Sequence, residues 1–292
     1  MEFSVGQVLE KTLSTVRDRF WPMFGLMAVY YIILLAAFVA FALFIGGVAA
    51  ALITSGNTPD FVSGFGGFGG FGSGIILTVI AIYLLMMYIL LSQAASLNAM
   101  ASPLQDINFG EAFLAGWRSG FTLLGIVILW IICVVIFALF LGLFGGIFSF
   151  GGGVSIVPAI LILLMIPVLV YLVCRLALVF PVVAIERQLN PFKAIGRSWE
   201  LSEGKVLTIF LIVLLYVAGV LVLDLVLFAP VDRSFLSPDT FLPSPSGGMI
   251  IYLIIAYVIF GTATALVIAS MLTAIHAALA GSSDADIADT FA

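Results

Sequence analysis

Six apolar runs, each long enough to cross a lipid bilayer, constrain this chain more than any other feature. They lie near residues 24–52, 75–100, 121–149, 156–180, 206–229 and 249–274. An α-helix rises about 1.5 Å per residue, so about 20 apolar residues cover a hydrocarbon core of roughly 30 Å. Hydrophobic residues make up 64% of the chain and charged residues only 9%. Soluble domains contain fewer hydrophobic and more charged residues. The sequence therefore predicts an all-α, polytopic membrane helix bundle with six transmembrane helices.

The two ends of the chain lie outside these runs. Residues 1–19 mix acidic and basic side chains, and the apolar run after them is too long for the h-region of a cleavable signal. We therefore expect the first span to remain in the mature protein, within a single transmembrane domain over residues 1–280. Residues 281–292 are expected to form a short acidic tail in the cytoplasm.

The ten basic residues are distributed unevenly among the connections between runs. Nine of them gather at the N-terminus, at the second connection and around the fourth: Lys11, Arg17, Arg19, Arg118, Arg175, Arg187, Lys193, Arg197 and Lys205. Only Arg233 falls in a connection of the opposite side. Because basic loops of membrane proteins stay in the cytoplasm, this pattern predicts that both termini are cytoplasmic.

The segment NPFKAIGRSWELSEGK, residues 190–205, predicts a short amphipathic helix on the cytoplasmic side. Asn190 is a favoured N-cap, and Pro191 suits the first helical position. At about 100° per residue, an apolar arc that contains Trp199 adjoins a charged arc that contains Arg197. We expect this helix to lie in the membrane interface, with Trp199 at the depth of the headgroups.

Two further segments match this one when their N-caps are aligned. Ser4 with Gln7 predicts a capping box before the first span, and Asn108 with Glu111 predicts another before the third. Aligning residues 4, 108 and 190 superimposes Val8, Ala112 and Ala194; Leu9, Phe113 and Ile195; and Leu13, Trp117 and Trp199. This match predicts a pseudo-threefold repeat of interfacial helix plus hairpin, with units near residues 3–100, 107–180 and 189–274. The alternative is that any amphipathic helix before a span would look similar.

The same segments resemble a known family. FSVGQVLEKTLSTVRDRF, FGEAFLAGWRS and RLALVFPVVAIERQLNPFKAIGRSWELSEGK are similar to the membrane domains of glycerophosphoryl diester phosphodiesterases and to the related YciC-like bacterial inner-membrane proteins. The resemblance implies a multi-pass protein of the bacterial inner membrane. We do not expect it to carry over the phosphodiesterase activity, because the stretch after residue 280 is short for the separate catalytic domain that names the family.

Residues that catalysis or cofactor binding would need are sparse. His276 is the single histidine, so a catalytic triad or a multi-histidine metal site has no second member, and we expect it to lie at the membrane interface. Cys133 and Cys174 lie in apolar runs, where we expect them to pack as small hydrophobic residues. The glycine-rich loop at residues 63–74 has no lysine, so we interpret it as a hairpin tip or interfacial anchor. We therefore expect a non-enzymatic protein without a metal or cofactor.

Arg175 is the most informative candidate for a binding site. A charge near the centre of a membrane costs at least roughly 2.5–3.5 kcal/mol, so this side chain must be compensated. It could snorkel to lipid phosphates, pair with Glu186 or Glu200 as a structural clamp, or bind a phosphate or carboxylate ligand between hairpins. Gln93 occupies the corresponding position of the preceding unit and could share a polar layer with it.

Two further features of the fourth and fifth runs bear on a transport path. Asp224, near the outer end of the fifth run, either forms a salt bridge with Arg233 or couples protons or cations, and the second role requires it to face the bundle interior. The fourth run carries Pro158, Pro167 and Pro181, so we expect it to be kinked.

Together these patterns favour a non-catalytic membrane module that interacts with lipids or with a membrane protein partner. Trp117 and Trp199 are the expected interfacial anchors. The expected contacts with anionic headgroups are Lys11, Arg17, Arg19, Lys193, Arg197 and Lys205. Nucleic acid is not an expected partner. The alternative is a small-solute transporter or channel, in which Arg175, Gln93 and Asp224 would line one continuous polar path.

Overall fold

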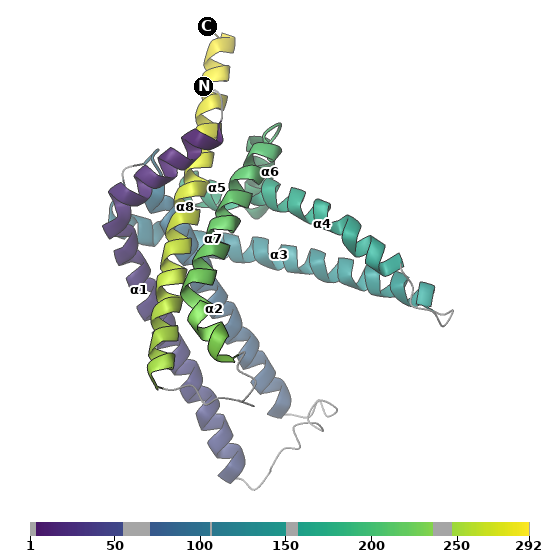
Figure 1. Cartoon of the computed structure of the whole chain (residues 1–292). Helices are drawn as coiled ribbons and strands as arrows, with labels where there is room; N and C mark the ends of the chain where they lie inside the picture. The colour runs from purple at the N-terminus through teal and green to yellow at the C-terminus, as the bar shows by residue number, and fades with distance from the viewer. Residues whose placement is uncertain (1–3, 55–70, 106, 150–156, 236–246, 292) are drawn as a thin grey trace.

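The computed structural model describes residues 4–54, 71–105, 107–149, 157–235 and 247–291, and all regular structure in these ranges is helical (Figure 1). The helices are α1 (Val5–Thr54), α2 (Phe71–Ala101), α3 (Phe109–Ser149), α4 (Val157–Leu176), α5 (Val179–Ile185), α6 (Pro191–Leu201), α7 (Val206–Phe235) and α8 (Gly247–Phe291). Within the described residues, six segments are long and apolar enough to cross a membrane: Val5–Gly47, Leu77–Ala101, Phe109–Phe140, Leu163–Ile185, Val206–Ala229 and Gly248–Gly281. The six predicted spans are thereby confirmed as helices of spanning length.

The predicted N-caps form the expected hydrogen bonds. The side chain of Asn190 accepts from two backbone amides in the first turn of α6. Asn108 Oδ1 accepts from the amide of Glu111 at 3.0 Å, and Glu111 Oε2 accepts from the amide of Asn108 at 3.3 Å, which completes a capping box before α3. Ser4 Oγ accepts from the amide of Gln7 at a longer 3.4 Å, but the described residues show no return bond from the Gln7 side chain, so the predicted capping box forms only in part. Each cap thus satisfies backbone donors that the helix itself cannot.

The three capped segments join their spans in different ways. In α1 the surface segment bends into the span at Arg19, whose φ of −110° and ψ of 16° are not helical. In α3 the helix continues without interruption from Phe109 to Ser149. Only α6 is a separate helix, because a turn over residues 202–205, with Gly204 at a φ of 68°, precedes α7.

The fourth predicted span is broken rather than kinked. Pro167 lies inside α4 without ending it, whereas the chain turns between Leu176 and Val179, shortly before Pro181. Proline has no amide to donate to the carbonyl four residues earlier, and its ring crowds that carbonyl, so the helix ends upstream. The short helix α5 that follows is buried at nearly every position. Because of this break, the end of the fourth span lies as α5 in the hydrophobic core of the protein.

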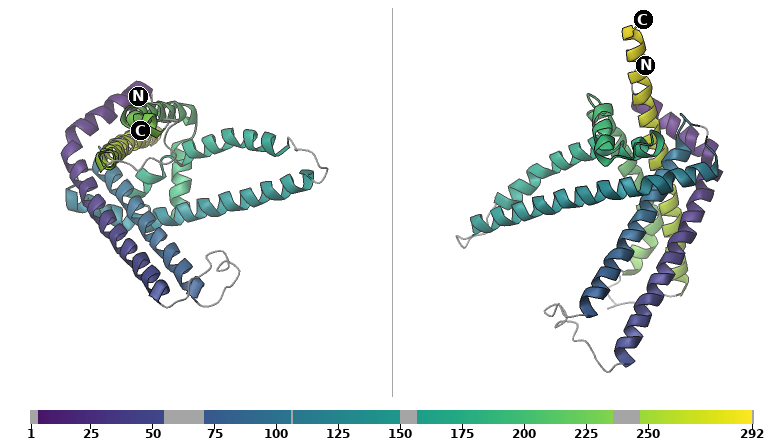
Figure 2. Two further views of the ribbon diagram at one scale, coloured as in Figure 1. Left: turned by 60° about the horizontal axis from the view of Figure 1, so that its bottom comes forward. Right: turned by 180° about the vertical axis from the view of Figure 1, so that it is seen from behind.

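The helices diverge from one common end. Helices α1, α2, α7 and α8 run roughly side by side, while α3 and α4 lean away from them in every view (Figures 1 and 2). The α1–α2 and α7–α8 hairpins therefore lie side by side, whereas the α3–α4 hairpin points away from them (Figures 1 and 2). Helix α5 contacts α2, α3, α6 and α8, and the larger hydrophobic core gathers its residues with Val8, Ala194, Ile209 and Ile275.

Helices α2 and α3 cross at small residues that the sequence analysis did not single out. A Cβ atom on Gly116 would overlap Ser96 Oγ and the carbonyl oxygen of Ser92, and one on Gly120 would overlap Ser92 Oγ. Small residues four positions apart let two helix backbones approach closely inside a membrane. The crossing holds the base of the α3–α4 hairpin against α2, where Tyr88 also donates to the carbonyl of Trp117 at 2.7 Å.

Candidate functional site

Arg175 lies in a cage made by α4 and the end of α6. Its Nε donates to the hydroxyl of Tyr171 at 3.0 Å, and its Nη1 donates to the carbonyl of Trp199 at 2.8 Å and to Ser202 Oγ at 3.4 Å. The guanidinium carbon lies 4.8 Å from the centroid of the Trp199 ring and 5.3 Å from that of Tyr171, within the range of a cation–π contact. Ser198 Oγ in turn donates to the Arg175 carbonyl at 2.7 Å. Arg175 therefore clamps α4 to α6.

The structure gives Glu186 and Glu200 a different partner from the predicted Arg175. Arg197 Nε lies 3.3 Å from Glu186 Oε2, and Arg197 Nη1 lies 3.2 Å from Glu200 Oε2. Arg175 instead donates to the carbonyl of Trp199 in the last turn of α6, where helix carbonyls have no backbone amide of the helix to accept from. The alternative in which Arg175 pairs with Glu186 or Glu200 is therefore wrong: the Trp199 carbonyl, the Ser202 hydroxyl and two aromatic rings hold Arg175 in place of carboxylates.

His276 is buried, which corrects the expectation that it lies at the interface. Its side chain is 1% exposed, and its Nε2 donates to Glu186 Oε1 at 2.9 Å. Its Nδ1 is buried and has no hydrogen-bond partner among the described residues. The hydrogen bond from His276 and, more weakly, the charge of Arg197 outweigh desolvation and hold the pKa of Glu186 below its usual range. Glu186 thus connects α8 and α6 at the end of α5.

The polar path required for a transporter does not form through Arg175, Gln93 and Asp224. Gln93 is buried, and its Nε2 donates to the sulfur of Met27 at 2.8 Å. Asp224 is exposed on α7 rather than turned to the bundle interior. Arg175 and Gln93 have different hydrogen-bond partners, and Asp224 is exposed. The side chain of Arg233, the expected partner of Asp224, lies outside the described part of the chain.

The predicted lipid contacts divide into exposed and paired residues. Arg19 Nη1 donates to the carbonyls of Met100 and Ser102 at 2.7 and 3.1 Å, so it caps the end of α2, and Arg197 is paired as described above. The others, Lys11, Arg17, Lys193 and Lys205, are exposed. Trp117 and Trp199 are 37% and 39% exposed, as interfacial anchors require. Their contact with lipid remains a prediction.

The remaining predictions concern the glycine-rich loop, the two cysteines and the C-terminal tail. In the glycine-rich loop, residues 63–70 lie outside the described ranges, and α2 begins at Phe71. Cys133 is exposed, Cys174 is buried, and both are free thiols. The backbone of residues 281–291, the expected tail, continues α8 as a helix.

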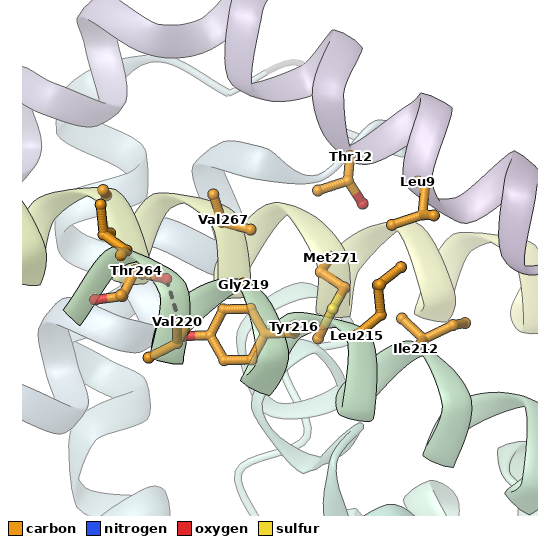
Figure 3. Close-up of a pocket in the computed structure, with 12 residues that line it drawn as sticks. Leu9, Thr12, Ile212, Leu215, Tyr216, Gly219, Val220, Thr264, Val267 and Met271 are labelled. Carbon is orange, nitrogen blue, oxygen red and sulfur yellow. Dashed lines mark hydrogen bonds between the residues drawn. The ribbon is translucent and has the colours of Figure 1, made fainter. Parts of the chain in front are cut away.

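An apolar groove of about 380 Å³ lies between α7 and α8, beneath the first turns of α1 (Figure 3). Helix α1 contributes Leu9 and Thr12, while α7 contributes residues between Ile212 and Leu223. Helix α8 contributes residues between Ala263 and Met271. No motif in the sequence marks this groove, because its three walls come from helices far apart along the chain.

The hydroxyl groups that line this groove are already hydrogen-bonded within the protein. Thr12 Oγ1 donates to the carbonyl of Val8 at 2.7 Å, and Thr264 Oγ1 donates to the carbonyl of Phe260 at 2.7 Å. The Tyr216 hydroxyl donates to the carbonyl of Thr264 at 3.3 Å (Figure 3). The groove therefore presents mainly hydrocarbon to an occupant, and it can bind an apolar chain without leaving a polar group unpaired.

Helices of this length and hydropathy define an integral, multi-pass membrane protein. Large apolar side chains along the spans, such as Leu43, Leu139 and Leu225, are more than 60% exposed, as surfaces that face lipid are. A scan against protein-family models, a search of curated proteins and a search of solved structures find no match to this chain.

Proposed function

We propose that this chain is a non-catalytic, lipid-binding module of a bacterial inner membrane, with both termini in the cytoplasm. The apolar groove between α7 and α8 carries the proposal. Its volume of about 380 Å³ falls in the range of small-molecule sites, roughly 300–1,000 Å³. Because its hydroxyls are internally satisfied, its surface favours hydrocarbon over a polar solute.

The length of the groove fits an acyl chain of one leaflet. From Ile212 to Leu223 it follows α7 for about 16 Å, at about 1.5 Å per residue. This is about half of a hydrocarbon core of roughly 30 Å. Lys11 precedes Thr12 of the groove wall, and Lys205 directly precedes α7, so exposed cations are available for an anionic headgroup. The proposed occupant is the acyl chain of a phospholipid in the cytoplasmic leaflet.

Matched burial supports the proposed threefold repeat. The aligned Val8, Ala112 and Ala194 are 2%, 0% and 0% exposed. At the later aligned position, Leu13, Trp117 and Trp199 are 70%, 37% and 39% exposed. The first of these positions is thus buried and the later one exposed in all three units, as a repeat would require. The inner-membrane location rests on the resemblance to glycerophosphoryl diester phosphodiesterase membrane domains, and the orientation rests on the distribution of basic residues.

The test fills the groove without disturbing its walls. A Cβ on Gly219, which lines the groove, meets nothing within 4 Å, so Gly219→Leu adds apolar bulk to the empty space. Gly142 on α3 is equally open, and Gly142→Leu is the matched control. We expect Gly219→Leu to lower the amount of co-purified phospholipid about tenfold, the effect of losing roughly two methylene contacts at about 0.8 kcal/mol each.

Native mass spectrometry after release from mild detergent measures this retention for the wild type and both variants. Retention that falls in Gly219→Leu and persists in Gly142→Leu supports the groove as the lipid site. Equal retention in all three proteins contradicts the proposal.

A further inference from the structure

A second cavity, of about 210 Å³, lies between α3 and the segment that follows α5. Arg118 of α3 and Arg187 of that segment both line it. Within the described structure neither guanidinium has a hydrogen-bond or ion-pair partner, whereas Arg175 and Arg197 each donate through Nε and Nη1. Two uncompensated cations therefore face one small cavity.

The other polar residues of this cavity leave its positive charge in place. Glu111 also lines it, but Glu111 Oε2 accepts from the amide of Asn108 in the capping box. Ser119 Oγ donates to the carbonyl of Val183 at 3.5 Å. One carboxylate against two guanidiniums leaves the cavity with a net positive charge, which favours an anionic occupant.

The backbone around Arg187 is held in an uncommon conformation. Arg187 has a φ of 54°, and it is the one non-glycine residue with positive φ in the described ranges. The segment is fastened on both sides: Glu186 is bonded to α6 and α8, the carbonyl of Leu189 accepts from Thr122 Oγ1 at 3.0 Å, and Asn190 caps α6. Strained residues persist where their surroundings fix them, and they cluster at binding sites. The backbone of Arg187 is thereby fixed at the cavity that Arg118 also lines.

We propose that Arg118 and Arg187 together bind a phosphate group. Guanidinium groups match phosphate oxygens with paired, charge-assisted hydrogen bonds. The phosphate can come from the headgroup of an anionic phospholipid or from a free anion of the cytoplasm. Leu114 and Leu189, both 54% exposed, line the same cavity and give the phospholipid an apolar surface beside its headgroup. The inference goes beyond the proposed groove, because it assigns a phosphate-binding site to a separate cavity.

The test compares an arginine variant with charge-matched controls. Arg118→Gln combined with Arg187→Gly removes both guanidiniums, and glycine adopts the backbone conformation of residue 187 without strain. Adding Glu10→Gln and Glu203→Gln, both on exposed residues outside the cavity, restores the net charge of the wild type. The pair Glu10→Gln and Glu203→Gln alone is the matched control.

Each protein is placed in micelles with equal amounts of phosphatidylglycerol and phosphatidylcholine of identical acyl chains, and bound lipids are identified by native mass spectrometry. We expect the wild type and the glutamate control to prefer phosphatidylglycerol. We expect both arginine variants to lose about tenfold of that preference, because the charge-assisted hydrogen bonds are gone. Equal preference in all four proteins, or no preference in the wild type, overturns the proposal.

Added inorganic phosphate separates the two sources. Phosphatidylglycerol that stays bound in millimolar phosphate identifies a lipid headgroup as the ligand. The other outcome is that phosphate displaces the lipid from the wild type but leaves the residual lipid on the arginine variants. This result assigns the same site to a soluble phosphate. Total lipid retention in Gly219→Leu is measured separately, so failure of the groove and failure of the arginine site are distinguishable.

Discussion

His276 Nε2 lies 2.9 Å from Glu186 Oε1, although 90 positions separate the two residues in the chain. The bond joins α8 to the end of α5, and Arg197 extends the connection to α6. One partly exposed carboxylate therefore holds three helices at the end of the molecule where the spans converge. Removing the Glu186 carboxylate is expected to loosen the segment that carries Arg187 of the proposed phosphate site.

Glu186→Gln is expected to lower stability at neutral pH by about 1–2 kcal/mol, because the charge-assisted bonds to His276 and Arg197 are lost. Folding lowers the pKa of Glu186 below its ordinary 4.5. Its stabilising contribution is therefore complete above that value and disappears as the pH falls through the folded-state pKa. Thermal unfolding in detergent between pH 7 and pH 3 should show the difference between wild type and variant shrinking in acid.

The control for this experiment is Glu200→Gln, which removes the other carboxylate of Arg197. Its side chain is 70% exposed, so we expect an effect below about 0.5 kcal/mol. A gap between wild type and Glu186→Gln that is constant from pH 7 to pH 3 would show that the carboxylate charge is not what stabilises the fold.

Arg175→Lys keeps the charge and removes the planar fork that contacts Tyr171 and Trp199. Lysine cannot reproduce the stacking and paired hydrogen bonds, so we expect a loss of about 1–2 kcal/mol in stability and unchanged lipid retention. Thermal unfolding and native mass spectrometry measure the two quantities. Lower lipid retention at unchanged stability would instead make Arg175 a ligand-binding residue.

Gly116→Val tests the crossing of α2 and α3. The new side chain would overlap Ser96 and the backbone of Ser92, so the helices must separate, at a cost of about 1–3 kcal/mol or more. Gly142→Val, where a Cβ meets nothing within 4 Å, serves as the control. A thermal midpoint for Gly116→Val equal to that of the control contradicts the close crossing.

Asn190→Ala removes the N-cap of α6. The side chain of Asn190 accepts hydrogen bonds from two backbone amides of this helix. We expect a loss of about 1 kcal/mol, the usual effect of an N-cap substitution. Ser4→Ala, which removes a single exposed bond of 3.4 Å, should have a smaller effect in the same unfolding assay. The reverse order would contradict the assigned strength of the two caps.

Local patterns in the sequence predicted much of the architecture. Runs of about 20 apolar residues identify spans because helix rise and bilayer thickness are constant. The caps at Asn108 and Asn190 were recognisable because a cap involves residues only two or three positions apart. The prolines of the fourth run were also a local signal. They predicted a kink, whereas the helix stops at Leu176, before Pro181. The spacing of Gly116 and Gly120 was also present and was not used.

The pairing of charged residues depended on the tertiary structure. Sequence suggested that Arg175 could pair with Glu186 or Glu200, yet Arg175 donates to the carbonyl of Trp199 and both carboxylates pair with Arg197. Asp224 is exposed because of the way α7 packs, which its position in an apolar run does not reveal.

Sequence alone determined the six long apolar helices, the capped starts of α3 and α6, and that the chain belongs in a membrane, because these properties arise from local patterns. Tertiary structure decided that His276 is buried against Glu186, that Arg118 and Arg187 share a cavity, and that α1, α7 and α8 enclose an apolar groove. Each of these joins elements distant in the chain, and their meeting depends on how whole helices pack rather than on any local pattern.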